Sequence, residues 1–251
     1  MAINLASVAA NVAAKPPRIL LYGPHGIGKT SFAAATPKPI VLQTEDGLGS
    51  LKVPHFPLAT SFEEVLEAIG ALIEEKHDYQ TVVIDSLDWL QNLIWEQINS
   101  RYDAKDLAYG KGAVIAADLW RDVLAGLNAL RNTKHMAVVL LAHCEVKRFD
   151  SPEVEPFERY QPKLQARSGA VLMEWVDILA FANYRTIVRK DDIGFNQTVS
   201  RGVTNGERLL NLNEKPAFLA KNRYSLPDVI PLSWEALEAA IIENTTAQDQ
   251  Q

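Results

Sequence analysis

The 251-residue chain contains a single cysteine, no long apolar run and no excess of basic residues. Cys144 alone cannot form an internal disulfide, and it excludes a zinc site built from several cysteines. The longest apolar run, residues 136–142, is far shorter than the roughly 18 residues that a membrane-spanning helix needs. These absences indicate a protein of a reducing compartment, expected in the cytoplasm and without a membrane partner.

The net charge of −6, from 25 Lys+Arg and 31 Asp+Glu, argues against a generally basic coat for nucleic acid. The charge is unevenly placed, however. Residues 101–223 hold 19 basic and 15 acidic residues, whereas residues 1–100 and 224–251 each carry a net charge of −5. A local anion-binding face in the middle of the chain is therefore compatible with the composition.

The ends of the chain differ from its middle. Residues 1–15 lack the basic start of a secretory signal and are interrupted by polar residues, so we expect a short N-terminal helical segment. Residues 244–251 are polar and predicted to form a disordered tail. With 47% apolar and 22% charged residues, the remaining segment, 16–243, is expected to form one folded domain.

Apolar strands alternate with helical patterns through most of this domain. Strands are predicted at 18–22, 39–43, 81–84 and 136–142, and helices from Lys29 and at 62–75, 87–102 and 114–130. The strands are apolar throughout, which is typical of a parallel sheet covered on both faces. The sequence therefore predicts an α/β fold with a mainly parallel central sheet flanked by helices.

The pattern changes after residue 176. Shorter strands are predicted at 177–182, 185–189, 207–212 and 217–220, with Asn205-Gly206 as a turn signal. A last helix is predicted at 234–242 with Ser233 as its N-cap. We interpret this part as antiparallel strands added at the C-terminal side of the same domain.

A phosphate-binding loop follows the first predicted strand. The pattern G-x-x-x-x-G-K-[ST] is matched by Gly23, Pro24, His25, Gly26, Ile27, Gly28, Lys29 and Thr30, with Ser31 next. The glycines let backbone N–H groups turn toward phosphate oxygens, and the helix that follows adds its dipole. Lys29 is expected to reach the β- and γ-phosphates of ATP, and Thr30 to hold Mg²⁺.

Two carboxylates are candidates for the same site. Asp85 ends the apolar strand at 81–84, where a carboxylate at the carboxyl end of a parallel strand can bind the water shell of Mg²⁺. It is also placed to cap the next helix, and the two roles are compatible. Glu45 follows the second strand and can orient an attacking water, although its position alone favours a solvated loop acid.

The order of these motifs resembles the RecA-like core of recombinases and hexameric helicases. In AAA+ proteins the catalytic glutamate directly follows the strand aspartate, where this chain has Ser86. The resemblance implies that Glu45 is the water-activating base. It also implies that His143, at the end of strand 136–142, senses the γ-phosphate, the alternative being a hydrogen-bonded histidine at a strand end.

A basic pair follows the predicted strand at 217–220. Lys221 and Arg223 look like the fingers that hexameric RecA-like ATPases insert into the neighbouring subunit's nucleotide site. An added positive charge would stabilise the transition state of phosphoryl transfer, so this resemblance implies self-association into a ring or filament. The alternative is a pair of solvated basic residues.

A more specific resemblance extends over most of the chain. Besides the phosphate loop, it rests on His143 leading into Lys147-Arg148-Phe149, on residues 160–164, and on residues 220–227. These look like the phage-encoded single-domain ATP-binding proteins with a RecA core, a group that includes Sak-type single-strand annealing proteins. The resemblance implies a RecA-like ATPase domain at 16–243 that acts on single-stranded DNA in the host bacterial cytoplasm, with a single-strand-binding protein as a possible partner.

Two predicted loops, 101–112 and 145–169, combine basic and aromatic residues in the way that single-stranded DNA binding requires. Their basic residues are Arg101, Lys105, Lys111, Lys147, Arg148, Arg159, Lys163 and Arg167. Acidic residues dilute the second loop, so an ordinary polar loop is the alternative. A vaguer third group comprises Arg185, Arg189, Lys190 and Arg201.

Three functions fit these observations. The first is an oligomeric ATPase that binds single-stranded DNA and promotes recombination or annealing. The second is a P-loop kinase for a small molecule, which would need an acceptor pocket and arginines in a lid. The third is an ATP-switched protein-assembly factor that binds no DNA, which the acidic net charge leaves open.

Overall fold

The computed structural model describes residues 15–192 and 198–248. The expected N-terminal helical segment falls almost entirely outside these residues. Five parallel strands form the centre of the sheet in the order β2-β3-β4-β1-β6. Their bounds are β1 (Arg18–Gly23), β2 (Pro39–Gln43), β3 (Thr81–Asp85), β4 (Ala137–Phe149) and β6 (Ile178–Asp192). The predicted mainly parallel sheet is thus confirmed.

Antiparallel strands extend the sheet on its C-terminal side, as predicted. Strand β7 (Thr198–Asn211) pairs with β6, and β9 (Val229–Pro231) pairs with β7. The short β8 (Lys221–Asn222) also pairs with β6. The two strands predicted at 177–182 and 185–189 form one strand, β6, with a register shift between Tyr184 and Thr186. The strand predicted at 217–220 is wrong, because only isolated bridges at Phe218 occur there.

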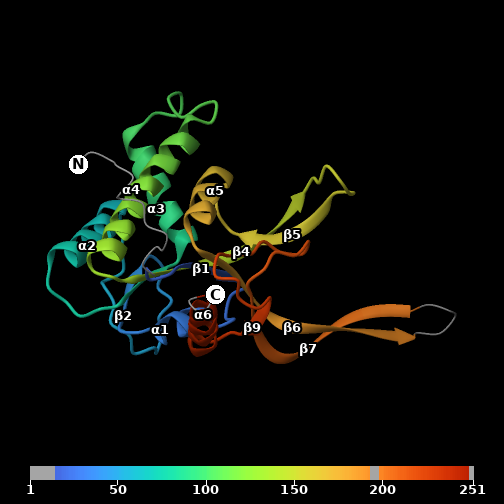
Figure 1. Ribbon diagram of the computed structural model, residues 1–251. Helices are drawn as coiled ribbons and strands as arrows, with labels where there is room; N and C mark the ends of the chain where they lie inside the picture. Colours follow the sequence, from blue (N-terminus) through green and yellow to red (C-terminus); the bar gives the residue numbers. More distant parts are fainter. Residues whose placement is uncertain (1–14, 193–197, 249–251) are drawn as a thin grey trace, which may run out of the picture.

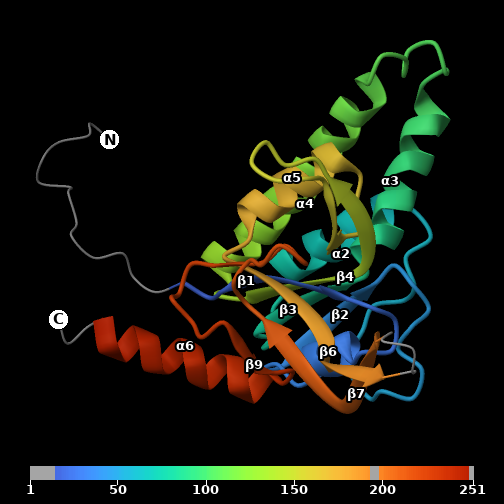
Figure 2. The same cartoon turned by 90° about the vertical axis from the view of Figure 1, so that its right-hand side faces the viewer.

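Helices cover both faces of the sheet (Figures 1 and 2). The bounds are α1 (Lys29–Ala34), α2 (Phe62–Glu74), α3 (Leu87–Arg101), α4 (Lys111–Thr133), α5 (Ala166–Trp175) and α6 (Trp234–Gln248). Alternate residues of β1 serve the two faces. Leu20 and Tyr22 pack in the core that α2, α3, α4 and α5 cover, whereas Ile19 and Leu21 pack in the core beneath α1 and α6.

The last helix is longer than the sequence predicts. Ser233 is its N-cap, and its hydroxyl accepts from the Ala236 N–H at 3.2 Å. The helix then continues to Gln248. The boundary predicted at residue 243 therefore lies within α6, and residues 244–248 of the expected disordered tail are helical, while residues 249–251 lie outside the described part.

Three pairs of elements project from the body (Figures 1 and 2). The first is α3 with α4, joined by the turn at residues 102–110. The second corrects the loop predicted at 145–169: β4 continues to Phe149 and pairs with β5 (Phe157–Pro162), after which α5 begins. The third is the β6–β7 hairpin. The sequence pattern missed β5 and α5 because both are short and partly exposed.

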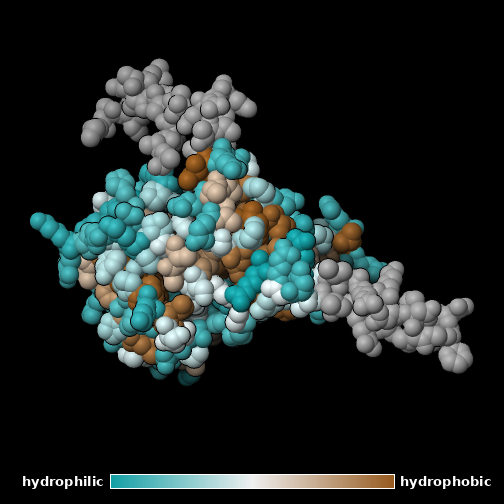
Figure 3. Space-filling view, turned by 90° about the horizontal axis from the view of Figure 1, so that it is seen from below, coloured by the Kyte–Doolittle hydropathy of each residue, from teal (hydrophilic) through white to brown (hydrophobic). Residues whose placement is uncertain are grey.

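The face seen in Figure 3 intermixes polar and apolar side chains. Among the described residues, no helix combines the length and the apolar character needed to cross a membrane. The apolar residues of the chain are concentrated in the two cores on either side of the sheet.

Candidate nucleotide-binding site

The strand order brings the predicted site residues to one edge of the sheet. Gly23, at the end of β1, pairs in register with His143 of β4, and β4 separates β1 from β3, which ends at Asp85. Glu45 follows the adjacent β2. Because parallel strands end at a common edge, residues that are far apart in sequence converge there.

The phosphate loop depends on its glycines at two positions. A Cβ on Gly23 would stand 2.5 Å from the Ala182 carbonyl oxygen, so β1 and β6 leave no space for one. Gly28 has a φ of +108°, in the region that side chains disfavour. Both constraints act on the backbone that precedes Lys29 and Thr30.

Lys29 lies inside this loop and is only 6% exposed. Its amine donates to the carbonyls of Gly23 and Pro24, at 3.1 Å each. Burial lowers the pKa of Lys29, and the nearby charge of Asp85 partly opposes that shift. A buried ammonium whose hydrogen bonds within the described residues go to carbonyl oxygens is suited to bind the oxygens of a phosphate group.

Thr30 and Asp85 meet across the mouth of the loop. The Thr30 hydroxyl donates to Asp85 Oδ2 at 2.7 Å. Burial raises the pKa of Asp85, and the hydrogen bond from Thr30 opposes that change. Within the described residues, no group of three or more His, Cys, Asp or Glu is arranged as a metal site. A hydroxyl and one carboxylate fit Mg²⁺, which takes its remaining ligands from water and phosphate.

Glu45 lines the same pocket as the loop residues Gly26 and Gly28. Its Oε2 accepts from the Ser86 hydroxyl at 3.0 Å and lies 4.0 Å from His143 Nδ1. Ser86 therefore orients the carboxylate that sequence analysis assigns to water activation. Glu45 is half-buried, which leaves its carboxylate open to the pocket.

His143 is fixed by a residue that sequence analysis missed. Asp88, in the first turn of α3, accepts from the His143 backbone N–H at 3.1 Å and lies 2.9 Å from Nδ1. Burial raises the pKa of Asp88, but the hydrogen bonds from His143 outweigh burial and leave that pKa below its usual range. The ring also stacks on His25 of the loop, with 3.8 Å between centroids. The charge of His143, with burial, lowers the pKa of His25.

Together these residues enclose a pocket of about 310 Å³. Its lining comprises His25, Gly26, Gly28, Lys29, Thr30, Ser31, Glu45, Gly47, Leu51, Asp85 and His143. Most of the predicted loop residues thus line the pocket, but Ile27 is fully buried in the core beneath α1 and holds the loop on the sheet.

A second pocket of about 490 Å³ opens beside the first. The two pockets share His25, Glu45 and His143. The second is otherwise lined by Asp88, Trp89, Gln91, Asn92, Glu145, Lys147, Lys163, Leu164 and Gln165. Trp89 was not predicted as a site residue. It is 46% exposed, whereas Leu87 and Leu90 beside it on α3 are buried. Glu45 and His143 therefore face two connected spaces.

Lys221 and Arg223 lie at the opposite edge of the sheet. Their neighbour Asp177 precedes β6 and binds Arg18, the first residue of β1, at 2.6 Å. Arg223 reaches the same carboxylate at 3.3 Å and is half exposed. The Lys221 amine donates to three carbonyls at the end of α5, those of Met173, Glu174 and Val176. Lys221 therefore caps α5, and both residues lie away from the chain's own phosphate loop.

The DNA-binding candidates separate into two groups. Arg101, Lys105 and Lys111 lie at the tip of the α3–α4 projection, and Arg101 pairs with Glu63. The others lie on or beside the β4–β5 hairpin, where several are paired: Lys147 with Glu145, Arg148 with Asp150, and Arg159 with Glu214. Lys163 and Arg167 are exposed. For the third group, only Arg185 has a described side chain, and it pairs with Glu207.

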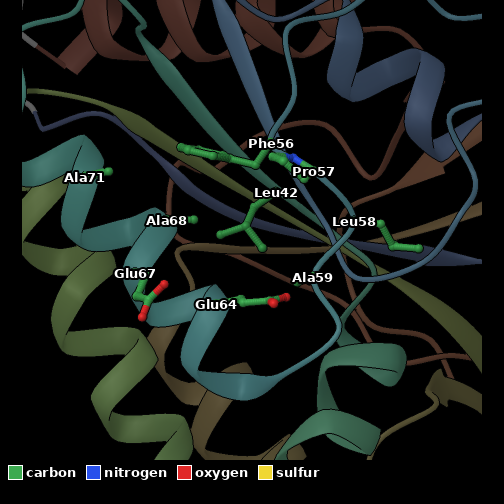
Figure 4. A pocket seen from close by; sticks show the side chains of 9 residues that line it. All are labelled: Leu42, Phe56, Pro57, Leu58, Ala59, Glu64, Glu67, Ala68 and Ala71. Carbon is green, nitrogen blue, oxygen red and sulfur yellow. The ribbon is translucent and has the colours of Figure 1, made fainter.

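Another hollow, of about 380 Å³, lies between α2 and the segment after β2 (Figure 4). It is lined by Leu42, Phe56, Pro57, Leu58, Ala59, Glu64, Glu67, Ala68 and Ala71. None of these is a predicted site residue, and the hollow is separate from the phosphate loop.

Comparison with known proteins relates the chain to a protein family, to a prophage protein and to solved structures, one of which is described here. Residues 15–224 match the model of the AAA domain family (AAA_24), a range that includes every residue of the 310 Å³ pocket. YorG, an SPbeta prophage-derived protein of Bacillus subtilis strain 168, is 24% identical over 267 residues, which cover 100% of this chain and 74% of YorG. The solved structure of the RadB recombinase covers 82% of this chain and 86% of its own, with 16% identity and a TM-score of 0.45.

Proposed function

The chain belongs to the AAA domain family, and we propose that it is an oligomeric ATPase that binds single-stranded DNA and promotes recombination or annealing. The main support for nucleotide binding is the buried amine of Lys29. All its described hydrogen bonds go to carbonyls of its own loop, in a pocket that Asp85, Glu45 and His143 close. Such a site fits a polyphosphate with Mg²⁺.

Each residue of the pocket then has a task in hydrolysis. A bound ATP–Mg²⁺ supplies an electrophilic γ-phosphorus and a good leaving group. Lys29 would exchange its carbonyl partners for phosphate oxygens, while Thr30 and Asp85 would hold the Mg²⁺ and its waters. Glu45, oriented by Ser86, accepts the proton of the attacking water. His143 would contact the terminal phosphate through Nε2. Its Nδ1 already donates a hydrogen bond to Asp88, so His143 can donate from Nε2 as well only when both ring nitrogens carry a hydrogen.

Arg223, with Lys221, would enter the nucleotide site of a neighbouring subunit. Support comes from their place at the sheet edge opposite the phosphate loop, so that a head-to-tail neighbour would bring this edge to the nucleotide. Arg223 is the better candidate, because it is half exposed and its planar guanidinium suits phosphate, whereas Lys221 would have to release three carbonyls.

The DNA part rests on the second pocket and the β4–β5 hairpin. Strand β4 runs without a break from His143 into the hairpin, so the nucleotide pocket and the basic side chains of Lys147 and Arg148 share one element. Trp89 and Lys163, which has no ion pair among the described residues, offer stacking and charge to a single strand. The relative YorG is prophage-derived, which supports a phage origin for this chain.

The test is the rate of ATP hydrolysis as a function of protein concentration, with and without single-stranded DNA. We expect a rate that rises more steeply than linearly, increases with DNA, and falls at least tenfold in Arg223→Ala. Arg121→Ala is the matched control, an exposed arginine near the same edge that is paired with Asp118. A rate linear in protein, indifferent to DNA and equal in both variants would reject the oligomeric DNA-dependent function.

A second function, phosphate transfer to a small molecule, is favoured by one observation. Glu45 also faces the second pocket, where an acceptor hydroxyl would lie beside the γ-phosphate position. Measuring ADP and free phosphate together separates the two functions, because a kinase forms ADP without an equal amount of phosphate when its acceptor is present. Equal amounts under all conditions, with no response to DNA, would instead favour an ATP-switched assembly factor.

A further inference from the structure

The terminal phosphate and the nucleoside of a bound nucleotide require different parts of the site. The residues assigned to the phosphate end, Asp85, Glu45 and His143, all belong to β3, β4 or the segment after β2, on one side of β1. On the other side of β1 stand β6 and β7. A nucleotide whose γ-phosphate lies beside Glu45 and whose remaining phosphates follow the loop to Gly28 would extend its nucleoside toward the β6–β7 side.

Arg208 of β7 stands on that side, directly against the phosphate loop. Its Nη1 is 2.9 Å from the position that a Cβ of Gly28 would take, and Leu232 Cδ2 is 4.0 Å from the same position. The Leu232 backbone N–H donates to the Arg208 carbonyl at 3.1 Å, which fixes the two residues next to each other. No sequence motif marked either residue.

The guanidinium of Arg208 is exposed and makes no ion pair or side-chain hydrogen bond with the described part of the chain. By contrast, Arg185 on the same hairpin binds Glu207 at 2.9 Å. An arginine that lies against a phosphate loop without a carboxylate is available to a ligand.

An aromatic residue is paired with Arg208 in the sheet. Tyr184 is the register partner of Arg208 across the β6–β7 ladder, and directly paired residues project from the same face of a sheet. Tyr184 and Leu232 both pack against the core beneath α1, which contains Ile27 of the phosphate loop. A guanidinium plane, an aromatic ring and an aliphatic side chain together form a surface suited to the flat face of a nucleobase.

We infer that Arg208, with Tyr184 and Leu232, forms the subsite for the base of the bound nucleotide. This inference rests on the proposed nucleotide-binding function, and it deepens that function by naming what holds the nucleoside end. Arg208 stacks on the base and contributes to affinity for nucleosides, not for inorganic polyphosphate. Purines, which have the larger ring face, bind better than pyrimidines.

The test compares two ligands by titration calorimetry in the presence of Mg²⁺, namely ADP and inorganic triphosphate. In Arg208→Ala we expect ADP to bind about tenfold more weakly while triphosphate binds as in the wild type. Arg208→Lys, which keeps the charge but loses the plane, should also weaken ADP binding. The matched control is Arg185→Ala, on the same hairpin but paired with Glu207, which should leave both affinities unchanged.

Two results would overturn the inference. One is unchanged ADP affinity in Arg208→Ala; the other is an equal loss of affinity for ADP and triphosphate, which would assign Arg208 to the phosphates. Lys29→Ala separates these results from failure of the proposed function. If Lys29→Ala loses both ligands while Arg208→Ala loses neither, the nucleotide site stands and the base subsite is rejected. A wild-type protein that binds neither ligand would reject both.

Discussion

His143 Nδ1 lies 2.9 Å from Asp88 Oδ2, so a histidine at the end of β4 is held by a carboxylate in the first turn of α3. Since the pKa of Asp88 is lowered, the carboxylate is ionised at neutral pH and can only accept, and Nδ1 carries the hydrogen. This bond fixes the ring over His25 and beside Glu45. Asp88 therefore positions the residue that faces both pockets.

Replacing Asp88 should impair turnover more than nucleotide binding. In Asp88→Asn we expect kcat for ATP hydrolysis to fall about tenfold or more, because the His143 ring loses its orientation. Affinity for ADP should change little, since Asp88 does not line the phosphate pocket. Steady-state kinetics and ADP titration measure the two effects. Asp118→Asn, on the exposed face of α4, is the control, and an equal loss of kcat and ADP affinity would contradict the positioning role.

Glu45 should be dispensable for binding and needed for hydrolysis. Glu45→Gln keeps a hydrogen-bond acceptor for Ser86 but removes the base, so we expect kcat to fall about 100-fold or more with ADP affinity retained. Single-turnover hydrolysis measures the chemical step. Asp46→Asn, the exposed neighbouring acid, should behave like the wild type. A fully active Glu45→Gln variant would show that Glu45 is a solvated loop acid and not the base.

Asp177 should contribute stability that depends on pH. It is buried and joins Arg18, Arg131 and Arg223. Burial raises its pKa, but the hydrogen bonds and charge of Arg18 outweigh burial and lower it overall. A lowered pKa in the folded state means that the stabilisation is complete above the unfolded value of about 3.9 and is lost as the pH falls below it.

Asp177→Asn should therefore lower the free energy of unfolding by about 3 kcal/mol at pH 7. Urea unfolding between pH 7 and pH 3 measures the difference from the wild type. We expect a constant difference down to about pH 5 and a smaller one below about pH 4. Asp78→Asn, in an exposed pair with Lys38, should cost less than about 1 kcal/mol. A difference that grows as the pH falls would show that the ion-pair account is wrong.

Lys221 and Arg223 should respond differently to substitution. Lys221→Met removes the donor for three carbonyls at the end of α5 and should cost about 2 kcal/mol of folding stability. Arg223→Ala keeps the Lys221 bonds and removes one donor to the Glu174 carbonyl, at 3.1 Å, so we expect a smaller loss of stability and a larger loss of ATPase activity. Urea unfolding and ATPase assays on both variants test this. A stable but inactive Lys221→Met would favour Lys221 as a catalytic finger.

Much of the fold could be predicted because its signals are local. The phosphate loop, the apolar strands and the helical periods each occupy a few consecutive residues, and strands with apolar side chains on both faces require a sheet covered by helices. Predictions failed where the structure depends on contacts between separate segments. Residues 145–169 have no apolar run, so the β4–β5 hairpin and α5 went unseen, and α6 continues into polar residues that a composition argument assigns to a tail.

For the site, the sequence by itself determined the chemistry of the loop: two glycines, a lysine and a threonine whose spacing admits a phosphate, with Asp85 at a strand end beside them. Only the tertiary structure decided which distant groups join them. Asp88 reaches His143 because α3 begins at the edge where β4 ends, and Arg208 reaches Gly28 because β7 pairs with β6 beside β1. Such contacts depend on strand order and register, which no single segment encodes.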